Sequence, residues 1–263
     1  MRNLYFLLAF QLLIVSTYAQ KSTGYKGRYF TRGNDTLPFR FLEPVGMQKG
    51  MKYPVIVVLH GSGERGSDNR LQLVHGARLF IDSSLRAEYP AYIIFPQCKV
   101  SKSWARVNKN RYSFDSLGGL TYQSALPPTP QLALVMQLLD SFVNQPSVDK
   151  DRIYIGGLSM GGMGVFEVLW RKPGFFAAGF PICGGGDPSK VAMYKEVPLW
   201  IFHGQDDPVV PVGNSRRMLS AFKSVGGNVK YSEYLGVVHN SWDNAFKEPG
   251  LMPWLFSQTR KRL

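Results

Sequence analysis

A short β-branched run in residues 151–164 leads directly into a serine flanked by glycines. Arg152–Ile155 is typical of a buried strand, and Met163–Trp170 is compatible with a helix. Between them, Gly157-Leu-Ser-Met-Gly161 fits the pattern G-x-S-x-G. A serine at a sharp strand-to-helix turn has a strained backbone, and flanking side chains larger than glycine would collide there. The segment therefore predicts Ser159 as a nucleophile at a helix N-terminus, in preference to a glycine-rich turn with a serine cap.

The rest of the chain alternates between apolar runs and amphipathic segments. We expect strands near 40–42 and at Tyr53–His60, Ala91–Phe95, Ala177–Ile182, Pro198–His203 and Asn228–Leu235. We expect helices at Leu71–Leu85, from Pro130 after a Thr129 cap, at Ser215–Val225, and over much of Asn240–Arg260. This alternation indicates an α/β fold with a mostly parallel sheet and helices on both faces.

The N-terminal residues have the features of a secretory signal. Arg2 precedes an apolar run from Leu4 to Val15, and Thr17 and Ala19 provide small residues before Gln20. The run is shorter than the roughly 20 residues that cross a bilayer as a helix. We therefore predict a signal peptide at 1–19, a single catalytic domain at 20–263, and a secreted or periplasmic protein without a stable membrane anchor.

The net charge is +13, and the chain has two cysteines. The basic residues are scattered and no nucleic-acid motif accompanies them, so we expect a solvated basic surface and no nucleic-acid partner. Cys98 and Cys183 would follow strands separated by two others, which places them beyond disulfide reach. We expect both thiols to be free. The oligomeric state does not follow from the sequence.

Activation of a serine requires a base, and histidine is the usual one. The chain offers His60, His75, His203 and His239. His60 and His203 end apolar strands and precede glycines, so we expect them to shape or pack beside the site, while His75 falls within a predicted helix. His239 follows a predicted strand in a loop on the same sheet edge as Ser159, so we assign it as the general base.

A carboxylate should hold the histidine tautomer, and backbone N–H groups should stabilise the oxyanion. Asp206 and Asp207 follow the strand that ends at His203, and we choose Asp207, with Asp206 as the alternative. The predicted oxyanion donors are the N–H of Met160, which follows the nucleophile, and the N–H of Ser62, with Gly63 next.

Residues 99–128 break the strand–helix alternation with a long, aromatic-rich stretch. Because such loops are commonly functional, we interpret it as an insertion on the substrate side. Within it Trp104, and beyond it Trp242, are candidate substrate-stacking residues, although buried core aromatics are an equal alternative.

With these residues in place, the chain resembles the α/β-hydrolase superfamily. The segments that resemble its phospholipase/carboxylesterase and feruloyl-esterase-like branch are Val57–Gly66, Asp151–Gly162 and His203–Pro208; some members are classed as prolyl-oligopeptidase-type peptidases. The order serine, aspartate, histidine is also the one associated with this fold. The resemblance implies about eight strands, ester hydrolysis through an acyl-enzyme, and neither metal nor organic cofactor.

We therefore expect an exported serine esterase that acts on a small-molecule or polysaccharide-linked ester, such as an acyl or feruloyl ester. One alternative is a serine peptidase of the same scaffold, which must also protonate a poor amine leaving group. An alternative of another class is a non-catalytic protein that binds anionic glycans through its basic surface. A complete triad in the right order favours the enzyme.

Overall fold

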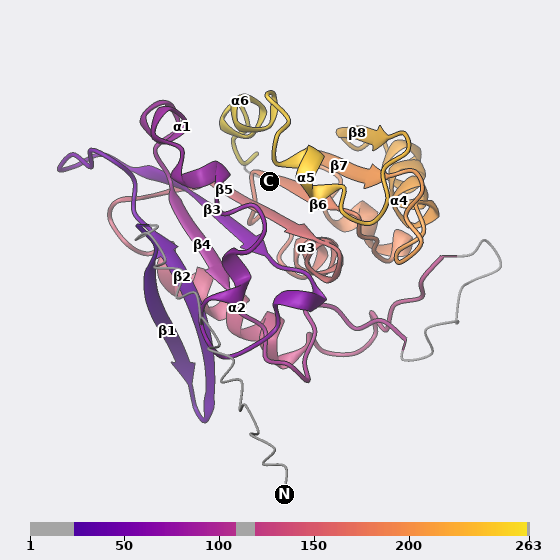
Figure 1. Cartoon of the computed structure of the whole chain (residues 1–263), viewed down its shortest axis with the longest axis horizontal. Helices are drawn as coiled ribbons and strands as arrows, with labels where there is room; N and C mark the ends of the chain where they lie inside the picture. The colour runs from indigo at the N-terminus through magenta and orange to yellow at the C-terminus, as the bar shows by residue number, and fades with distance from the viewer. Residues whose placement is uncertain (1–23, 109–118, 262–263) are drawn as a thin grey trace, which may run out of the picture.

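A twisted sheet of eight strands organises residues 24–108 and 119–261, the part of the chain that the computed structural model describes (Figure 1). The predicted signal peptide, residues 1–19, lies outside the described residues. The strands are β1 (Lys26–Arg32), β2 (Asp35–Leu42), β3 (Tyr53–Leu59), β4 (Tyr92–Pro96), β5 (Val148–Leu158), β6 (Ala178–Ile182), β7 (Leu199–Gly204) and β8 (Val229–Tyr234).

The strand order is β1-β2-β4-β3-β5-β6-β7-β8, with the nucleophile strand β5 in the interior of the sheet. The neighbours from β4 to β8 pair in parallel, whereas β1 and β2 pair antiparallel to each other and β2 pairs antiparallel to β4. This confirms the predicted mostly parallel sheet. The sequence did not predict β1, whose residues are mostly exposed.

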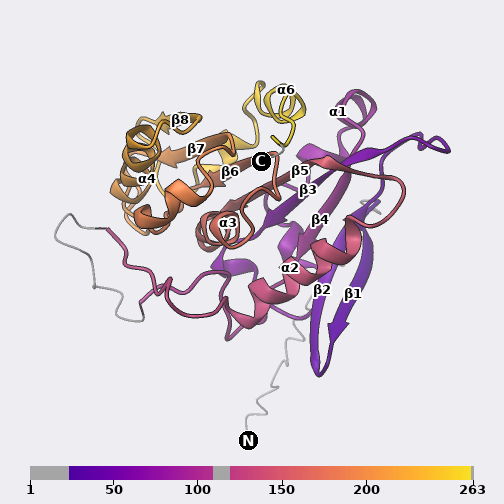
Figure 2. The ribbon, with the colours of Figure 1, turned by 180° about the vertical axis from the view of Figure 1, so that it is seen from behind.

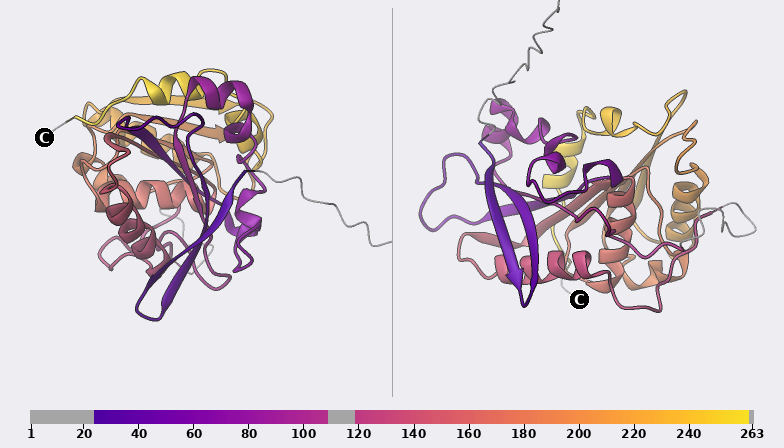
Figure 3. Two further views of the ribbon diagram at one scale, coloured as in Figure 1. Left: turned by 90° about the vertical axis from the view of Figure 1, so that its left-hand side faces the viewer. Right: turned by 60° about the horizontal axis from the view of Figure 1, so that its bottom comes forward.

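Helices cover both faces of the sheet. Seen from behind, α2, α3 and α4 lie in front of the sheet (Figure 2), and α1 and α6 lie on the other side (Figure 3). The helices are α1 (Ser83–Glu88), α2 (Pro130–Phe142), α3 (Met160–Arg171), α4 (Gly213–Ser224), α5 (Trp242–Ala245) and α6 (Leu251–Phe256). As predicted, α2 begins at Pro130, and the Thr129 side chain accepts a hydrogen bond from the Leu132 N–H.

The alternation of side chains along the strands divides the core between these two faces. On β3, Val55, Val57 and Leu59 pack in the cluster that contains α2, α3 and α4, whereas Ile56 and Val58 pack in the cluster that contains α5 and α6. All five side chains are fully buried. Burial on both faces explains the continuous apolar run in the sequence.

The predicted helix at Leu71–Leu85 is wrong. This stretch contains two short 3₁₀ turns, Leu71–Leu73 and Leu79–Ile81, before α1. Gly76 has a φ of +79°, and a Cβ at that position would lie 2.4 Å from the Phe246 ring. The close approach of Phe246 therefore requires glycine in a left-handed turn, which ends any helix there. The C-terminal region is likewise divided between the short helices α5 and α6.

Two hydrogen bonds tie the described part of the 99–128 insertion to the sheet edge that carries Ser159. The Trp104 Nε1–H donates to the His60 carbonyl at 3.0 Å, and the Leu120 N–H donates to Asn214 Oδ1 at 2.7 Å. The insertion thus bridges the loop after β3 and the start of α4. Tyr112 and Phe114, part of its aromatic content, lie outside the described residues.

Cys98 and Cys183 are both buried and unbridged, as expected. They follow β4 and β6, with β3 and β5 between those strands. In the portions at 24–108 and 119–261, every helix is too short or too polar to cross a membrane.

Candidate active site

The backbone of Ser159 adopts a conformation that L-amino acids rarely take, with φ 52° and ψ −116°. It lies at the junction of β5 and α3, and its N–H donates to the Ile182 carbonyl at 2.9 Å. A Cβ on Gly161 would lie 2.0 Å from the Leu59 carbonyl oxygen, and one on Gly157 would lie 2.6 Å from the Gly161 carbonyl oxygen. The G-x-S-x-G spacing is therefore a steric requirement of this turn, and the strained serine stands at the N-terminus of α3.

A continuous chain of hydrogen bonds joins Ser159, His239 and Asp207. His239 Nε2 is 2.9 Å from Ser159 Oγ, and His239 Nδ1 is 2.7 Å from Asp207 Oδ2. The three residues lie on the loops that follow β5, β8 and β7, at the carboxyl ends of parallel strands, where open α/β sheets commonly bind ligands. The structure thus brings together the three residues that the sequence predicts as nucleophile, base and carboxylate.

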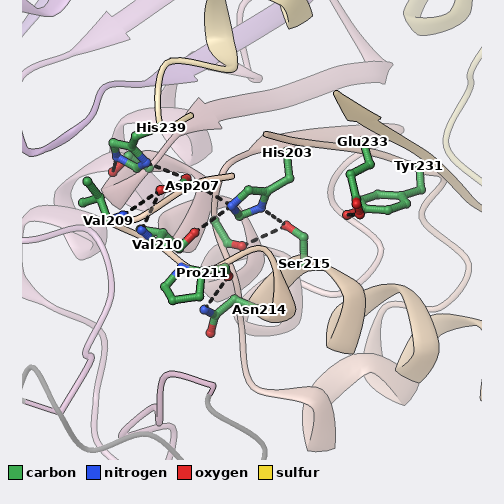
Figure 4. Close-up of polar contacts among 12 residues, drawn as sticks. His203, Asp207, Val209, Val210, Pro211, Asn214, Ser215, Tyr231, Glu233 and His239 are labelled. Atoms are coloured by element: carbon green, nitrogen blue, oxygen red, sulfur yellow. Dashed lines mark hydrogen bonds and ion pairs between the residues drawn. The ribbon is translucent and has the colours of Figure 1, made fainter. Parts of the chain in front are cut away.

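The Asp207 carboxylate is buried and receives hydrogen bonds from several directions (Figure 4). Its Oδ1 accepts the N–H groups of Val209 at 2.8 Å and Val210 at 2.9 Å. Burial opposes its ionisation, but the hydrogen bonds from His203, His239 and these two N–H groups outweigh burial and hold the pKa of Asp207 well below its usual range. Asp207 is therefore an anion at neutral pH and can stabilise a protonated His239.

Asp206, the alternative carboxylate, is exposed. Its contribution to the site is through the backbone, since its N–H donates to the Val237 carbonyl at 3.0 Å. Gly204 lies close to the same loop, so that a Cβ there would come within 2.3 Å of the Val237 and Val238 carbonyl oxygens. These contacts fix the loop of Asp207 against the loop of His239.

The predicted oxyanion donors lie on two segments beside Ser159. Met160 is the first residue of α3, so its N–H has no partner within the helix. A Cβ on Gly61 would lie 3.6 Å from Ser159 Cβ, which places the turn containing Ser62 against the nucleophile. Because a trans peptide directs its C=O and N–H to opposite sides, the hydrogen bond between His60 and the Gly61 carbonyl turns the Ser62 N–H away from His60.

His60 is buried between the turn that begins at Gly61 and the segment at Cys98, and it contacts both. Its Nε2 accepts the Cys98 N–H at 2.9 Å, so its Nδ1 carries the proton and donates to the Gly61 carbonyl at 2.6 Å. Burial lowers the pKa of His60 to about 4, despite the opposing effect of the Gly61 hydrogen bond. His60 is thus a neutral structural histidine at physiological pH, in line with the expectation that it shapes the site.

The prediction that Trp104 stacks on substrate is wrong. Trp104 is fully buried in the core cluster on the α2 and α3 face, and its Nε1–H is used by the His60 carbonyl. It therefore has no free ring face. Trp242 is only partly buried and lies edge-on to His239, with ring centroids 5.3 Å apart. Trp242 also contacts the His75 ring, with centroids 5.0 Å apart, so it lies between His75 and His239.

Arg65 was missed from the sequence, whereas His203 was expected to shape or pack beside the site without a named partner. Arg65 donates from Nε to the Ser62 carbonyl at 2.8 Å and from Nη1 to the Val100 carbonyl at 3.1 Å, which ties the predicted oxyanion turn to the insertion. His203 contacts Asp207 directly, with 3.2 Å between Nε2 and Oδ2. His203 and Asp207 are four residues apart across a turn, and this spacing was the sequence signal that could have predicted their contact.

Cys183, Asp207 and His239 present potential metal-ligating atoms within 4.8 Å of one another. However, His239 Nδ1 and Asp207 Oδ2 are 2.7 Å apart, whereas two ligands of one tetrahedral zinc ion lie about 3.3 Å apart. The spacing fits a shared proton better than a shared metal ion. We therefore treat the imidazole and the carboxylate as a hydrogen-bonded pair.

Residues 43–248 match the sequence profile of a family described as phospholipase/carboxylesterase. Acyl-protein thioesterase 1 from Neurospora crassa is 25% identical over 203 residues, which cover 71% of this chain and 80% of the thioesterase. The family match at residues 43–248 includes Ser159, Asp207 and His239.

Solved structures with the same architecture include a thermostable esterase, with a TM-score of 0.79 and 35% sequence identity. The alignment covers 90% of this chain, which spans only 64% of the length of that esterase. A ferulic acid esterase has a TM-score of 0.63 at 17% identity, covering 88% of this chain and 97% of the other, a likeness that shows the fold alone.

Proposed function

The chain belongs to the phospholipase/carboxylesterase family of α/β-hydrolases, and we propose that it hydrolyses carboxylic esters through an acyl-enzyme formed on Ser159. The observation that carries this proposal is the hydrogen-bond chain from Ser159 Oγ through His239 to a buried, ionised Asp207. Such a chain provides a nucleophile, a base and a group that holds the base in the required tautomer.

In the first half-reaction, Ser159 Oγ attacks the ester carbonyl carbon while His239 Nε2 takes the hydroxyl proton. The tetrahedral oxyanion accepts hydrogen bonds from the N–H groups of Met160 and Ser62, an effect worth roughly 3 kcal/mol per donor in comparable sites. When the C–O bond to the alcohol breaks, His239 returns the proton to the leaving oxygen. The products are a free alcohol and acyl-Ser159.

In the second half-reaction, water attacks the acyl-enzyme and loses its proton to His239. The second tetrahedral intermediate uses the same N–H donors, and its collapse releases the acid and restores the Ser159 hydroxyl. Asp207 stays ionised throughout, because the hydrogen bonds around it keep its pKa low.

For the substrate, we propose acyl or feruloyl-type esters attached to polysaccharides. Trp242 supports this proposal, because its partly exposed ring lies beside His239, which protonates the leaving alcohol. A flat aromatic surface at that position suits the apolar face of a sugar or an aryl ring. The insertion along the same sheet edge provides further contact area.

We also propose that the protein is exported after removal of residues 1–19. The support is the basic and apolar pattern that precedes Gln20. Determination of the N-terminus of the protein recovered from its native compartment tests this directly. A chain that starts near Gln20 supports export, whereas an intact Met1 contradicts it.

The test of the activity is hydrolysis of p-nitrophenyl acetate and methyl ferulate by the purified protein. We expect turnover by the wild type and a loss of at least about 10⁴-fold in Ser159→Ala, as for other serine hydrolases that lose the nucleophile. Ser224→Ala, an exposed serine at the end of α4, is the control. No turnover by the wild type, or equal turnover in Ser159→Ala, contradicts the proposal. Hydrolysis of methyl ferulate would support the feruloyl-ester assignment.

A further inference from the structure

A second histidine contacts the aspartate of the proposed triad. His203 is the penultimate residue of β7, is fully buried, and lies on the opposite side of Asp207 from His239 (Figure 4). His203 Nε2 is 2.8 Å from the Val210 carbonyl oxygen and 3.2 Å from Asp207 Oδ2. Asp207 Oδ2 is therefore shared between two imidazole rings.

The hydrogen-bond partners of His203 show that its Nε2 is a donor. The Val210 carbonyl can only accept a hydrogen bond, so His203 Nε2 must carry the hydrogen. That N–H also faces Asp207 Oδ2, which can only accept because Asp207 is ionised. The other nitrogen, Nδ1, is 2.7 Å from Ser215 Oγ, whose single hydrogen faces both Nδ1 and the Gly184 carbonyl, 3.0 Å away.

Ser215 links this arrangement to the rest of the scaffold. It lies in the first turn of α4 and is fully buried, so α4 holds the His203 ring through its hydroxyl. A ring held at both nitrogens cannot rotate without breaking buried hydrogen bonds, which costs about 1–3 kcal/mol for each group left unsatisfied. His203 thus presents its Nε2–H to Asp207 in one fixed direction.

We propose that His203, held by Ser215, is a positioning residue that sets both the orientation and the effective negative charge of Asp207 toward His239. This inference rests on the proposed function. A carboxylate that must align with a histidine on one side is fixed best when donors restrain it from the other sides. The N–H groups of Val209 and Val210 hold Oδ1, and His203 restrains Oδ2.

The groups that surround His203 define the electrostatic side of the proposal. Besides Asp207 and His239, Glu233 lies on the adjacent strand β8, directly across from His203. Arg216 and Tyr231 both donate to the Glu233 carboxylate, and these contacts keep the pKa of Glu233 low. The Glu233 carboxylate is thus bonded by Arg216 and Tyr231. The carboxylate that His203 Nε2 contacts is that of Asp207.

Two amide substitutions separate the roles of the two ring nitrogens of His203. The amide nitrogen of His203→Gln can take the place of Nε2, whereas the shorter His203→Asn places its amide near Nδ1 and cannot reach Asp207. Both are polar and of similar volume, so each is the control for the other. Ser215→Ala leaves His203 in place but removes its Nδ1 partner.

We expect His203→Gln to retain kcat within about threefold and His203→Asn to lose about tenfold to a hundredfold in kcat, because misplacement of a catalytic group by about 1 Å costs up to that much. KM should not change, since His203 does not contact substrate. In His203→Asn, Asp207 loses its second donor and carries more effective negative charge toward His239. The protonated form of His239 is then stabilised, so the acidic limb of the kcat/KM profile should move to higher pH.

Labelling of Ser159 by a fluorophosphonate probe separates this inference from the proposed function. In that reaction Ser159 Oγ bonds to phosphorus, fluoride leaves, and His239 takes the proton, so no ester substrate is needed. If the wild type neither hydrolyses esters nor labels, the proposed function fails. If the wild type reacts and His203→Asn matches its rate, KM and pH profile, only the His203 proposal is overturned.

Thermal melts establish whether each variant folds. Should His203→Asn fail to fold, Ser215→Ala decides the question. The proposal then requires a loss of about threefold or more in kcat and the same direction of pH shift in Ser215→Ala, since the His203 ring loses its fixed orientation. An unchanged kcat and pH profile in a folded Ser215→Ala overturns the proposal.

Discussion

The backbone of Gly161 lies so close to the Leu59 carbonyl oxygen that a Cβ on Gly161 would come within 2.0 Å of it. The added Cβ is fixed to the backbone of the serine turn, and the Leu59 oxygen belongs to the backbone at the end of β3. Relief of the clash must therefore move the sheet or the nucleophile. We therefore expect Gly161→Ala to lower the free energy of unfolding by about 3 kcal/mol, the upper range for overpacking. The measurement is denaturant unfolding.

Gly213→Ala is the matched control for Gly161→Ala. Gly213 begins α4, and a Cβ there would meet no atom within 4 Å. Alanine in a helix is favoured over glycine by up to about 1 kcal/mol, so this variant should be neutral or more stable. Equal destabilisation by both substitutions would contradict the steric explanation of the glycine.

Asp207 and Asp206 are adjacent in sequence but differ in environment, which gives a second prediction. Asp207→Asn replaces the acceptor of the His239 Nδ1–H with an amide that favours the wrong tautomer, so we expect kcat to fall by about 10³- to 10⁴-fold. Asp206→Asn alters only an exposed side chain and should keep wild-type kcat. Steady-state kinetics on one ester suffice, and a larger loss in Asp206→Asn would reassign the carboxylate.

His60 predicts how stability depends on pH. Its pKa is about 4 in the folded protein, against about 6.5 when unfolded, so the unfolded chain binds more protons between these values. The free energy of unfolding should therefore fall by about 3 kcal/mol as the pH is lowered from 6.5 to 4. The contribution of Asp207 is lost only at lower pH, as the pH falls from its unfolded pKa of about 3.9 toward the depressed folded value.

Urea unfolding at several pH values tests this prediction. In His60→Asn the amide can still donate to the Gly61 carbonyl, but it does not titrate. The slope of stability against pH between 4 and 6.5 should therefore be shallower than in the wild type. An identical slope in both proteins would show that the proton uptake belongs to another group.

The strands and turns that were predicted correctly are those that a local sequence pattern determines. The runs at β3, β4 and β7 are almost entirely apolar because those strands are buried on both faces, and the serine turn is defined by its glycines. By contrast, β1 exposes most of its residues at the edge of the sheet, so no alternation marks it. It pairs with β2 through a hairpin in which Arg32 faces Asp35, so the two-residue turn Gly33-Asn34 was the sequence signal that could have predicted β1.

The errors have a common physical origin in long-range contacts. The predicted helix around Gly76 is prevented by the ring of Phe246, 170 residues further along the chain. Trp104 was a candidate for substrate stacking or for the core, and its burial and its hydrogen bond to the His60 carbonyl, 44 residues away in sequence, place it in the core. The pairing of His203 with Asp207 likewise depends on how the turn after β7 folds back.

Trp104 and Trp242 should respond differently to truncation. Trp104→Ala removes a fully buried ring and its hydrogen bond, so we expect a loss of about 3–5 kcal/mol in stability. Trp242→Ala should instead raise KM for the larger ester and cost little stability, because the ring is partly exposed beside His239. Thermal melts and kinetics on p-nitrophenyl acetate and methyl ferulate distinguish the two. An unchanged KM in Trp242→Ala would remove it from the substrate site.

The Ser62 N–H can be deleted without altering the turn that carries it. Ser62 begins a 3₁₀ turn, a position where proline is well tolerated, and the preceding Gly61 has the extended backbone that proline requires, with φ −76° and ψ −177°. Ser62→Pro should therefore fold normally and lose about 10²- to 10³-fold in kcat, the cost of one oxyanion donor. Ser62→Ala keeps the N–H and should match the wild type. Full activity in Ser62→Pro would exclude Ser62 as the donor and transfer the role to the N–H of Gly63.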